Sequence, residues 1–210
     1  MSALAGRRLY LCTPDRPDLA RFLRECIGGG VDLVQLRDKD LDDRRLIERA
    51  RLALEVCWEA GVPLVVNDRA DLALAAGADG VHLGQDDAPV SLARRILAPS
   101  ALVGLSTHSE AELEQAQGAD CDYVSVGPVV PTPTKPGRPG TGLGLVSAAA
   151  ARSAKPFFVT GGVAPDTVPG LVRAGARRFV VVRYLTQADR PGHRAAELRR
   201  VIDEELSRAA

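Results

Sequence analysis

Short apolar runs recur along the chain and alternate with longer segments in which apolar residues return every three or four positions. The short runs predict buried strands of a parallel sheet, and the longer segments predict helices that cover it. The runs lie at 8–12, 33–36, 63–66, 80–83, 102–105, 123–126, 156–159 and 179–182. Eight strands alternating with helices indicate an α/β protein with one domain over residues 1–210, a single (β/α)8 TIM barrel.

Several helix ends can be placed from the sequence. Asp40 is expected to cap the helix that follows the second strand, and Gly61 to end it, because glycine tolerates the left-handed conformation found there. Ser109 with Glu112 fits a capping box at the start of a helix over 110–117.

Composition narrows the possible partners. The chain has zero formal net charge and 4% aromatic residues, which argues against nucleic acid as a partner. No segment has the roughly 20 apolar residues that span a bilayer. The four cysteines form no CxxC pair, and the first residues lack a secretory signal, so we expect reduced thiols, a cytoplasmic location and no membrane partner. The sequence leaves open whether subunits form a homo-oligomer.

A strip of hydrogen-bond donors follows the second strand. Alternation along an extended segment puts Gln35, Arg37 and Lys39 on one side. An arginine fork beside a lysine point charge suits a polyphosphate, and glutamine adds a neutral hydrogen bond. A solvated strand end would explain the same residues.

Acidic residues follow the next two strands. Asn67 and Asp68 end the third, and Asp86 and Asp87 follow the fourth. Two carboxylates beside a phosphate site suit Mg²⁺, and we assign Asp68 and Asp87 to it. Asp86 could replace Asp87, and helix capping is the alternative explanation.

Later loops offer further phosphate contacts. Ser106 follows the fifth strand, and the proline-rich segment 127–144 carries Thr132, Thr134 and Lys135. A segment this long is typical of a functional loop or lid, where Lys135 could neutralise a leaving pyrophosphate. A polar, proline-rich turn is the alternative.

The last two strands complete the candidate site. The pair 161–162 is Gly-Gly, and Arg183 is expected to end the eighth strand, where barrels often bind phosphate through backbone N–H groups. A tight turn is the alternative for the glycines. His82, His108 and His193 form no evident metal-binding cluster and are expected to be hydrogen-bonded structural residues.

These motifs together resemble the thiamine phosphate synthase family over nearly the whole chain: 35–39 (QLRDK), 67–68 (ND), 84–87 (GQDD), 127–128 (GP), 132–135 (TPTK) and 161–162 (GG). The resemblance implies a transferase of thiamine biosynthesis with two small-molecule substrates. It would move the 4-amino-2-methyl-5-hydroxymethylpyrimidine group from its pyrophosphate to a thiazole phosphate, or to the carboxylated form of that thiazole. The products are thiamine phosphate and pyrophosphate.

The resemblance also implies roles for individual residues. Gln35, Arg37, Lys39 and Asn67 would hold the pyrimidine pyrophosphate, Asp68 and Asp87 would bind Mg²⁺, Ser106 would contact the pyrimidine and Lys135 the pyrophosphate. Arg37, Ser106 and Lys135 would be the catalytic group. Thr132, Thr134, Gly162, Val182 and Arg183 would hold the thiazole phosphate, although family members often have serine where this chain has Arg183.

The implied mechanism is dissociative, with pyrophosphate leaving before the thiazole nitrogen attacks. A thiazole tautomerase is the main rival, because it would share the barrel but would not need Lys39, Asp68, Asp87 and Lys135. A catalytically silent barrel that binds thiamine intermediates is a second alternative, and a generic phosphate-binding barrel enzyme is a third.

Overall fold

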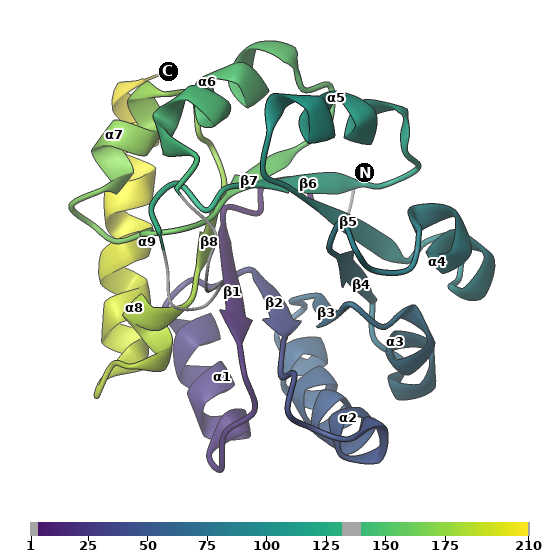
Figure 1. The fold of residues 1–210 in the computed structure, drawn as a ribbon. Coiled ribbons are helices and arrows are strands. Elements are labelled where there is room, and N and C mark those ends of the chain that lie inside the picture. Colours follow the sequence, from purple (N-terminus) through teal and green to yellow (C-terminus); the bar gives the residue numbers. More distant parts are fainter. Residues whose placement is uncertain (1–3, 132–139, 210) are drawn as a thin grey trace.

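A computed structural model describes residues 4–131 and 140–209. Over these residues eight parallel strands pair in chain order, and the first also pairs with the eighth, which closes the barrel (Figure 1). The strands are β1 (Leu9–Thr13), β2 (Leu33–Leu36), β3 (Leu64–Asn67), β4 (Gly80–Leu83), β5 (Leu102–Thr107), β6 (Tyr123–Val126), β7 (Phe157–Val159) and β8 (Phe179–Val181).

Helices surround this ring of strands, as Figure 1 shows. They are α1 (Leu19–Gly28), α2 (Asp43–Glu59), α3 (Ala70–Ala76), α4 (Val90–Ile96), α5 (Glu110–Gly118), α6 (Gly142–Arg152), α7 (Val168–Arg173), α8 (Arg183–Thr186) and α9 (Pro191–Arg208). The predicted (β/α)8 barrel is therefore confirmed. No helix within 4–131 or 140–209 is long and apolar enough to cross a membrane.

Several predicted strand ends differ from the structure by one or two residues, and two of these differences affect candidate site residues. β5 continues to Thr107 because Ser106 pairs with Ser125 of β6, so Ser106 belongs to the strand and not to the loop after it. β8 ends at Val181, and Arg183 begins α8 instead of ending the strand. Both changes matter because the place of a residue along its strand determines how far its side chain lies from the carboxyl end of the barrel.

The predicted cap of α2 was also misplaced. Asp42 caps this helix by accepting a hydrogen bond from the Arg45 N–H at 2.8 Å. Asp40 instead donates its N–H to the Asp38 carboxylate at 3.0 Å, in the turn before the helix. Gly61 follows the helix with a φ of +65°, as expected.

The predicted cap of α5 is confirmed, because Ser109 accepts the Glu112 N–H. The reciprocal bond of the capping box differs, since the Glu112 carboxylate accepts from the His108 N–H at 2.7 Å.

The strands separate two apolar layers. Side chains that point outward from the barrel, such as Leu9 and Leu11, pack under the helices. Side chains that point inward, such as Tyr10 and Phe158, form a second cluster inside the ring, which Leu4 joins. Alternation along each strand thus fills both the helix interface and the lower barrel interior. Polar side chains at the upper positions lie above this inner cluster and form the candidate site.

Candidate active site

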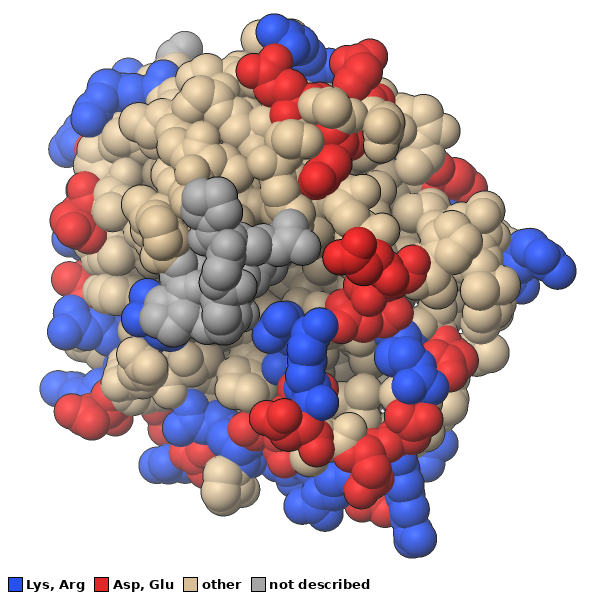
Figure 2. Space-filling view, viewed as in Figure 1, with Lys and Arg blue, Asp and Glu red and all other residues tan. Residues whose placement is uncertain are grey.

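A pocket of about 660 Å³ opens beside the carboxyl ends of the strands. Its lining includes these predicted site residues: Gln35, Arg37, Lys39, Asn67, Asp68, Asp87, Ser106, Gly162, Val182 and Arg183. Figure 2 shows basic and acidic side chains next to each other near the middle of one face of the molecule. The predicted contacts Thr132, Thr134 and Lys135 lie outside the described residues.

The donor strip after β2 faces this pocket as predicted. Gln35 is 4% exposed and belongs to the strand, whereas Lys39 has a half-exposed side chain near the acidic residues. Arg37 lies between them, and its N–H donates to the Thr13 carbonyl at 2.8 Å, which keeps the chain beside β1 beyond the end of β2. The strip therefore carries a neutral amide on the pocket floor and two cations higher up.

The acidic pair lies beside this strip, on the same side of the pocket. Lys39 Nζ is 3.0 Å from Asp68 Oδ2. Asp68 has a φ of +64°, which is uncommon for a residue other than glycine, and its N–H donates to the His82 carbonyl at 2.8 Å. Asp87 accepts the Gly84 N–H at 2.5 Å.

Asp87 and Asp68 influence each other electrostatically. Burial raises the pKa of Asp87, and the neighbouring Asp68 carboxylate raises it further, although the Gly84 N–H and Lys39 act in the opposite direction. Two carboxylates this close favour a bound cation. Asp86, the alternative ligand, is exposed. Within the described residues no group of three or more His, Cys, Asp or Glu side chains is arranged to hold a metal ion, so a cation here would need further oxygen ligands from substrate or water.

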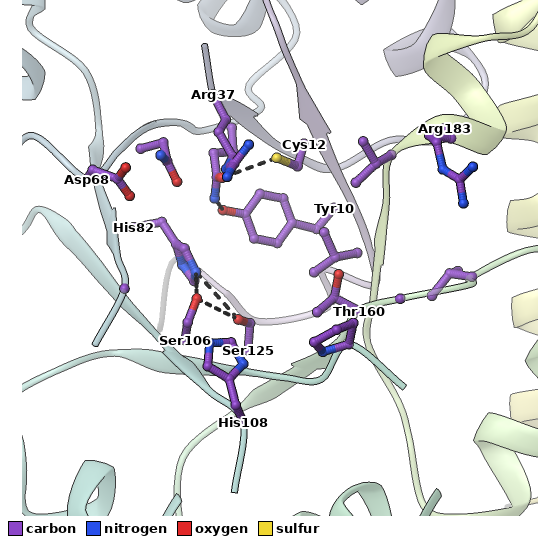
Figure 3. A pocket seen from close by; sticks show the side chains of 18 of the residues that line it. Tyr10, Cys12, Arg37, Asp68, His82, Ser106, His108, Ser125, Thr160 and Arg183 are labelled. Carbon is purple, nitrogen blue, oxygen red and sulfur yellow. Dashed lines mark hydrogen bonds between the residues drawn. The ribbon is translucent and has the colours of Figure 1, made fainter. Parts of the chain in front are cut away.

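The two sides of the pocket have different chemistry. Asp68 and Arg37 lie on one side in Figure 3, and Arg183 lies on the other. Gly161 and Gly162, with φ values of +93° and +77°, turn the chain after β7. A Cβ at Gly161 would lie 2.6 Å from the Val129 nitrogen, so glycine is required for this close approach. The two glycines thus form the tight turn that was the alternative explanation for them, and this turn also borders the pocket.

Sequence reasoning missed much of the pocket floor. Polar groups from the inward-facing positions of several strands meet there (Figure 3). His82 is hydrogen-bonded through both ring nitrogens, as expected for a structural histidine, yet it also lines the pocket. Period-two alternation could have identified these positions, because each is two residues from another inward-facing residue. The lining residues missed in this way include Tyr10, Cys12, His82, Ser125 and Thr160.

The mouth of the pocket also contains residues that were not predicted as site residues. His108 Nδ1 lies 2.5 Å from the Gly127 carbonyl, so this nitrogen carries the proton and donates it. Gln85 Nε2 donates to the Ser106 carbonyl at 2.6 Å. The first bond joins the loop after β5 to the loop after β6, and the second joins the loop after β4 to β5 itself.

Comparisons with known proteins show which proteins this chain is similar to. The family model described as thiamine monophosphate synthase matches residues 9–185. A thiamine-phosphate synthase of Mycobacterium sp. (strain KMS) is 52% identical, covering 98% of this chain and 96% of its own length. One from Thermobifida fusca is 49% identical over 94% and 93% of the two chains. The structure of thiamine phosphate pyrophosphorylase from Pyrococcus furiosus superposes with a TM-score of 0.87, at 29% identity over 98% of each chain.

Proposed function

Because the chain belongs to the thiamine monophosphate synthase family and is a transferase of thiamine biosynthesis, we propose the reaction and site roles that follow. The enzyme transfers the aminopyrimidine, through the methylene carbon attached to its ring, from the pyrophosphate ester to the ring nitrogen of a thiazole phosphate. The products are thiamine phosphate and pyrophosphate.

The observation that carries this proposal is the contact between the acidic pair and the donor strip on one side of the pocket. Lys39 forms an ion pair with Asp68, and the half-buried Asp87 lies beside Asp68. A magnesium pyrophosphate needs both carboxylates for the metal and cations for the phosphate oxygens. A proton-shifting tautomerase would need neither group.

Asp68 and Asp87 would hold Mg²⁺, which when bound would supply positive charge to the pyrophosphate. The raised pKa of Asp87 and its proximity to Asp68 fit this role, because a cation would relieve the repulsion between the two carboxylates. Arg37 and Lys39 would bind the pyrophosphate oxygens. Lys135 keeps the same proposed role from its place in the sequence.

The proposed mechanism is dissociative. The bond between the methylene carbon and the pyrophosphate oxygen breaks first, and its electron pair leaves with the oxygen. The pyrimidine-stabilised cation is then captured by the lone pair of the thiazole nitrogen. Gly162, Val182 and Arg183, across the pocket from Asp68, would hold the acceptor's phosphate so that this nitrogen lies beside the cation.

The test is product formation with a matched pair of variants. The purified protein would be incubated with Mg²⁺ and both substrates, and thiamine phosphate and pyrophosphate would be measured together. Asp87→Ala should lower the rate roughly 100-fold or more, as expected for loss of a charge-stabilising group. Asp86→Ala removes the exposed neighbouring carboxylate and should leave the rate within about threefold of wild type.

Two results would contradict the proposal in different ways. No product from folded wild-type protein would refute the synthase reaction and favour a tautomerase or a binding protein. Equal losses in Asp86→Ala and Asp87→Ala, or a rate that EDTA leaves unchanged, would retain the reaction but refute the assignment of the metal ligands or of the metal.

A further inference from the structure

A chain of hydrogen bonds crosses the barrel interior below the pocket. Gln35 Nε2 donates to Tyr10 Oη at 2.5 Å, and Tyr10 Oη lies 3.1 Å from Tyr123 Oη. Tyr123 Oη is 3.1 Å from His82 Nδ1, and His82 Nε2 is 3.0 Å from Ser106 Oγ. The chain thus joins two predicted substrate contacts, Gln35 and Ser106, through three residues without an assigned role.

These groups are shielded from water. Tyr10 and Tyr123 are 0% exposed, and Gln35, His82 and Ser106 are 4%, 6% and 5% exposed. Burial also raises the pKa of both tyrosines, so each hydroxyl keeps its proton. A buried donor or acceptor without a partner costs about 1–3 kcal/mol, so the arrangement that satisfies every group is strongly preferred.

The direction of each hydrogen bond follows from the end of the chain at Gln35. The Cys12 thiol donates to Gln35 Oε1 at 3.2 Å, which orients the amide so that its nitrogen faces Tyr10. Tyr10 accepts from that nitrogen and donates to Tyr123, and Tyr123 donates to His82 Nδ1. The neutral imidazole therefore carries its proton on Nε2.

This tautomer decides what Ser106 can do. His82 Nε2–H donates to Ser106 Oγ, and Ser125 Oγ donates to the same oxygen at 3.3 Å. Ser125 Oγ is also 3.4 Å from His82 Nε2, which keeps the three groups together. These two bonds use both acceptor positions of Ser106 Oγ, so a further partner can only accept the proton of this hydroxyl. Ser106 also borders the pocket.

We propose that Tyr123 is a positioning residue: it fixes the His82 tautomer and thereby holds Ser106 as a hydrogen-bond donor to a ring nitrogen of the aminopyrimidine. This inference rests on the proposed function. Without the Tyr123 hydroxyl, His82 can protonate Nδ1 instead, and Nε2 then accepts the proton of Ser106. Ser106 would no longer have a donor for the substrate.

A glycine in the backbone allows the rings of His82 and Tyr123 to lie close together. Gly104 on β5 is paired with His82 on one side and Tyr123 on the other. The two rings stack across it with centroids 5.5 Å apart and planes at 25°. A Cβ at Gly104 would lie 2.2 Å from Tyr123 Cζ and 2.4 Å from His82 Nδ1. Glycine inside a strand often marks such a close approach.

The experiment compares how tightly Tyr123→Phe and wild type bind three ligands. These are the aminopyrimidine pyrophosphate and two analogues of it, each with one of the two ring nitrogens replaced by CH. Dissociation constants would be measured calorimetrically with Mg²⁺ and without thiazole phosphate. The quantity compared is the ratio of the analogue's dissociation constant to that of the aminopyrimidine pyrophosphate. In wild type this ratio should be roughly 10 for at least one analogue, the value of one lost hydrogen bond. In Tyr123→Phe the ratio should fall to about two or less.

A merely structural role would weaken both ligands equally and leave the ratio unchanged, which would overturn the proposal. Tyr184→Phe is the matched control, because the Tyr184 hydroxyl bonds to Glu197 of α9 at 2.7 Å, outside the chain of hydrogen bonds. Its ratio should equal that of wild type. Ser106→Ala should lower the ratio as far as Tyr123→Phe, and combining the two should lower it no further.

A second measurement needs no variant. The ¹⁵N chemical shifts of the His82 ring in the wild-type protein should show an unprotonated Nδ1 and a protonated Nε2; the reverse assignment would overturn the proposal even if Tyr123→Phe failed to fold. If wild type forms no thiamine phosphate, the proposed function fails and the substrate part of this inference fails with it. Product formation with an unchanged ratio refutes the inference alone.

Discussion

Replacing Gly104 by alanine should destabilise the protein, because the added methyl group has no space between His82 and Tyr123. The new Cβ would lie 2.2 Å from Tyr123 Cζ and 2.4 Å from both Tyr123 Oη and His82 Nδ1. Carbon atoms in contact normally stay at least about 3.5 Å apart. Both rings are buried, so relief requires the strands or the rings to move.

The size of the effect can be estimated from opposing terms. Overpacking a core by one methyl group costs typically about 1–3 kcal/mol, and the rigid rings place this site at the upper end. Alanine recovers up to about 1 kcal/mol by restricting the unfolded chain. The net loss of about 1–2 kcal/mol corresponds to a fall in Tm of roughly 2–8 °C for a chain of this size.

Thermal unfolding followed by circular dichroism would measure this change, with Gly118→Ala as the control. Gly118 ends α5, and a Cβ there would meet nothing within 4 Å, so its Tm should stay the same or rise. In a double-mutant cycle, Tyr123→Leu should make Gly104→Ala less costly, because it removes the ring that the methyl group meets. A Tm for Gly104→Ala within about 1 °C of wild type would refute the packing explanation.

Three further predictions concern charge and burial. Asp87→Asn should raise Tm in Mg²⁺-free buffer at neutral pH while lowering activity, because burial and Asp68 raise the pKa of Asp87 and so disfavour its ionised form in the folded protein; this gain should shrink as the pH falls through that raised pKa, and a lower Tm would contradict it. Asp32→Ala should cost about 2–3 kcal/mol in urea unfolding with kcat unchanged, because Asp32 accepts two backbone N–H groups at the opposite end of the barrel. Burial raises the pKa of Cys26 and Cys57 to about 12, so mass spectrometry should find neither alkylated by iodoacetamide at pH 8 in the folded protein.

The barrel itself could be predicted because its signal is local and repeated. Each strand is a short apolar run, and the count of eight with intervening helices admits few other folds. The limits of each element were less certain. The sequence predicted Asp40 as the cap of α2, two residues before the cap that forms, because only the geometry of the turn selects Asp42.

The upper part of the candidate site could also be predicted. Charged residues lie directly after strands, among them Arg37, Lys39 and Asp68, and the barrel topology brings them to one end. The sequence assigned Asp87 as a ligand with Asp86 as the alternative, but it could not show how the two side chains differ in their surroundings. That difference arises at the turn after β4, where the Gly84 N–H donates to Asp87 while Asp86 is exposed.

The floor of the pocket depends on closure of the whole barrel. Tyr10 and Tyr123 are 113 positions apart, and their contact exists only because the strands form a ring that turns both side chains inward. Glycine inside a strand ordinarily weakens it, yet Gly104 makes room for the stacked rings. Under the proposed function, the charged side chains would bind the magnesium pyrophosphate, whereas the neutral chain from Gln35 to Ser106 would recognise the pyrimidine itself.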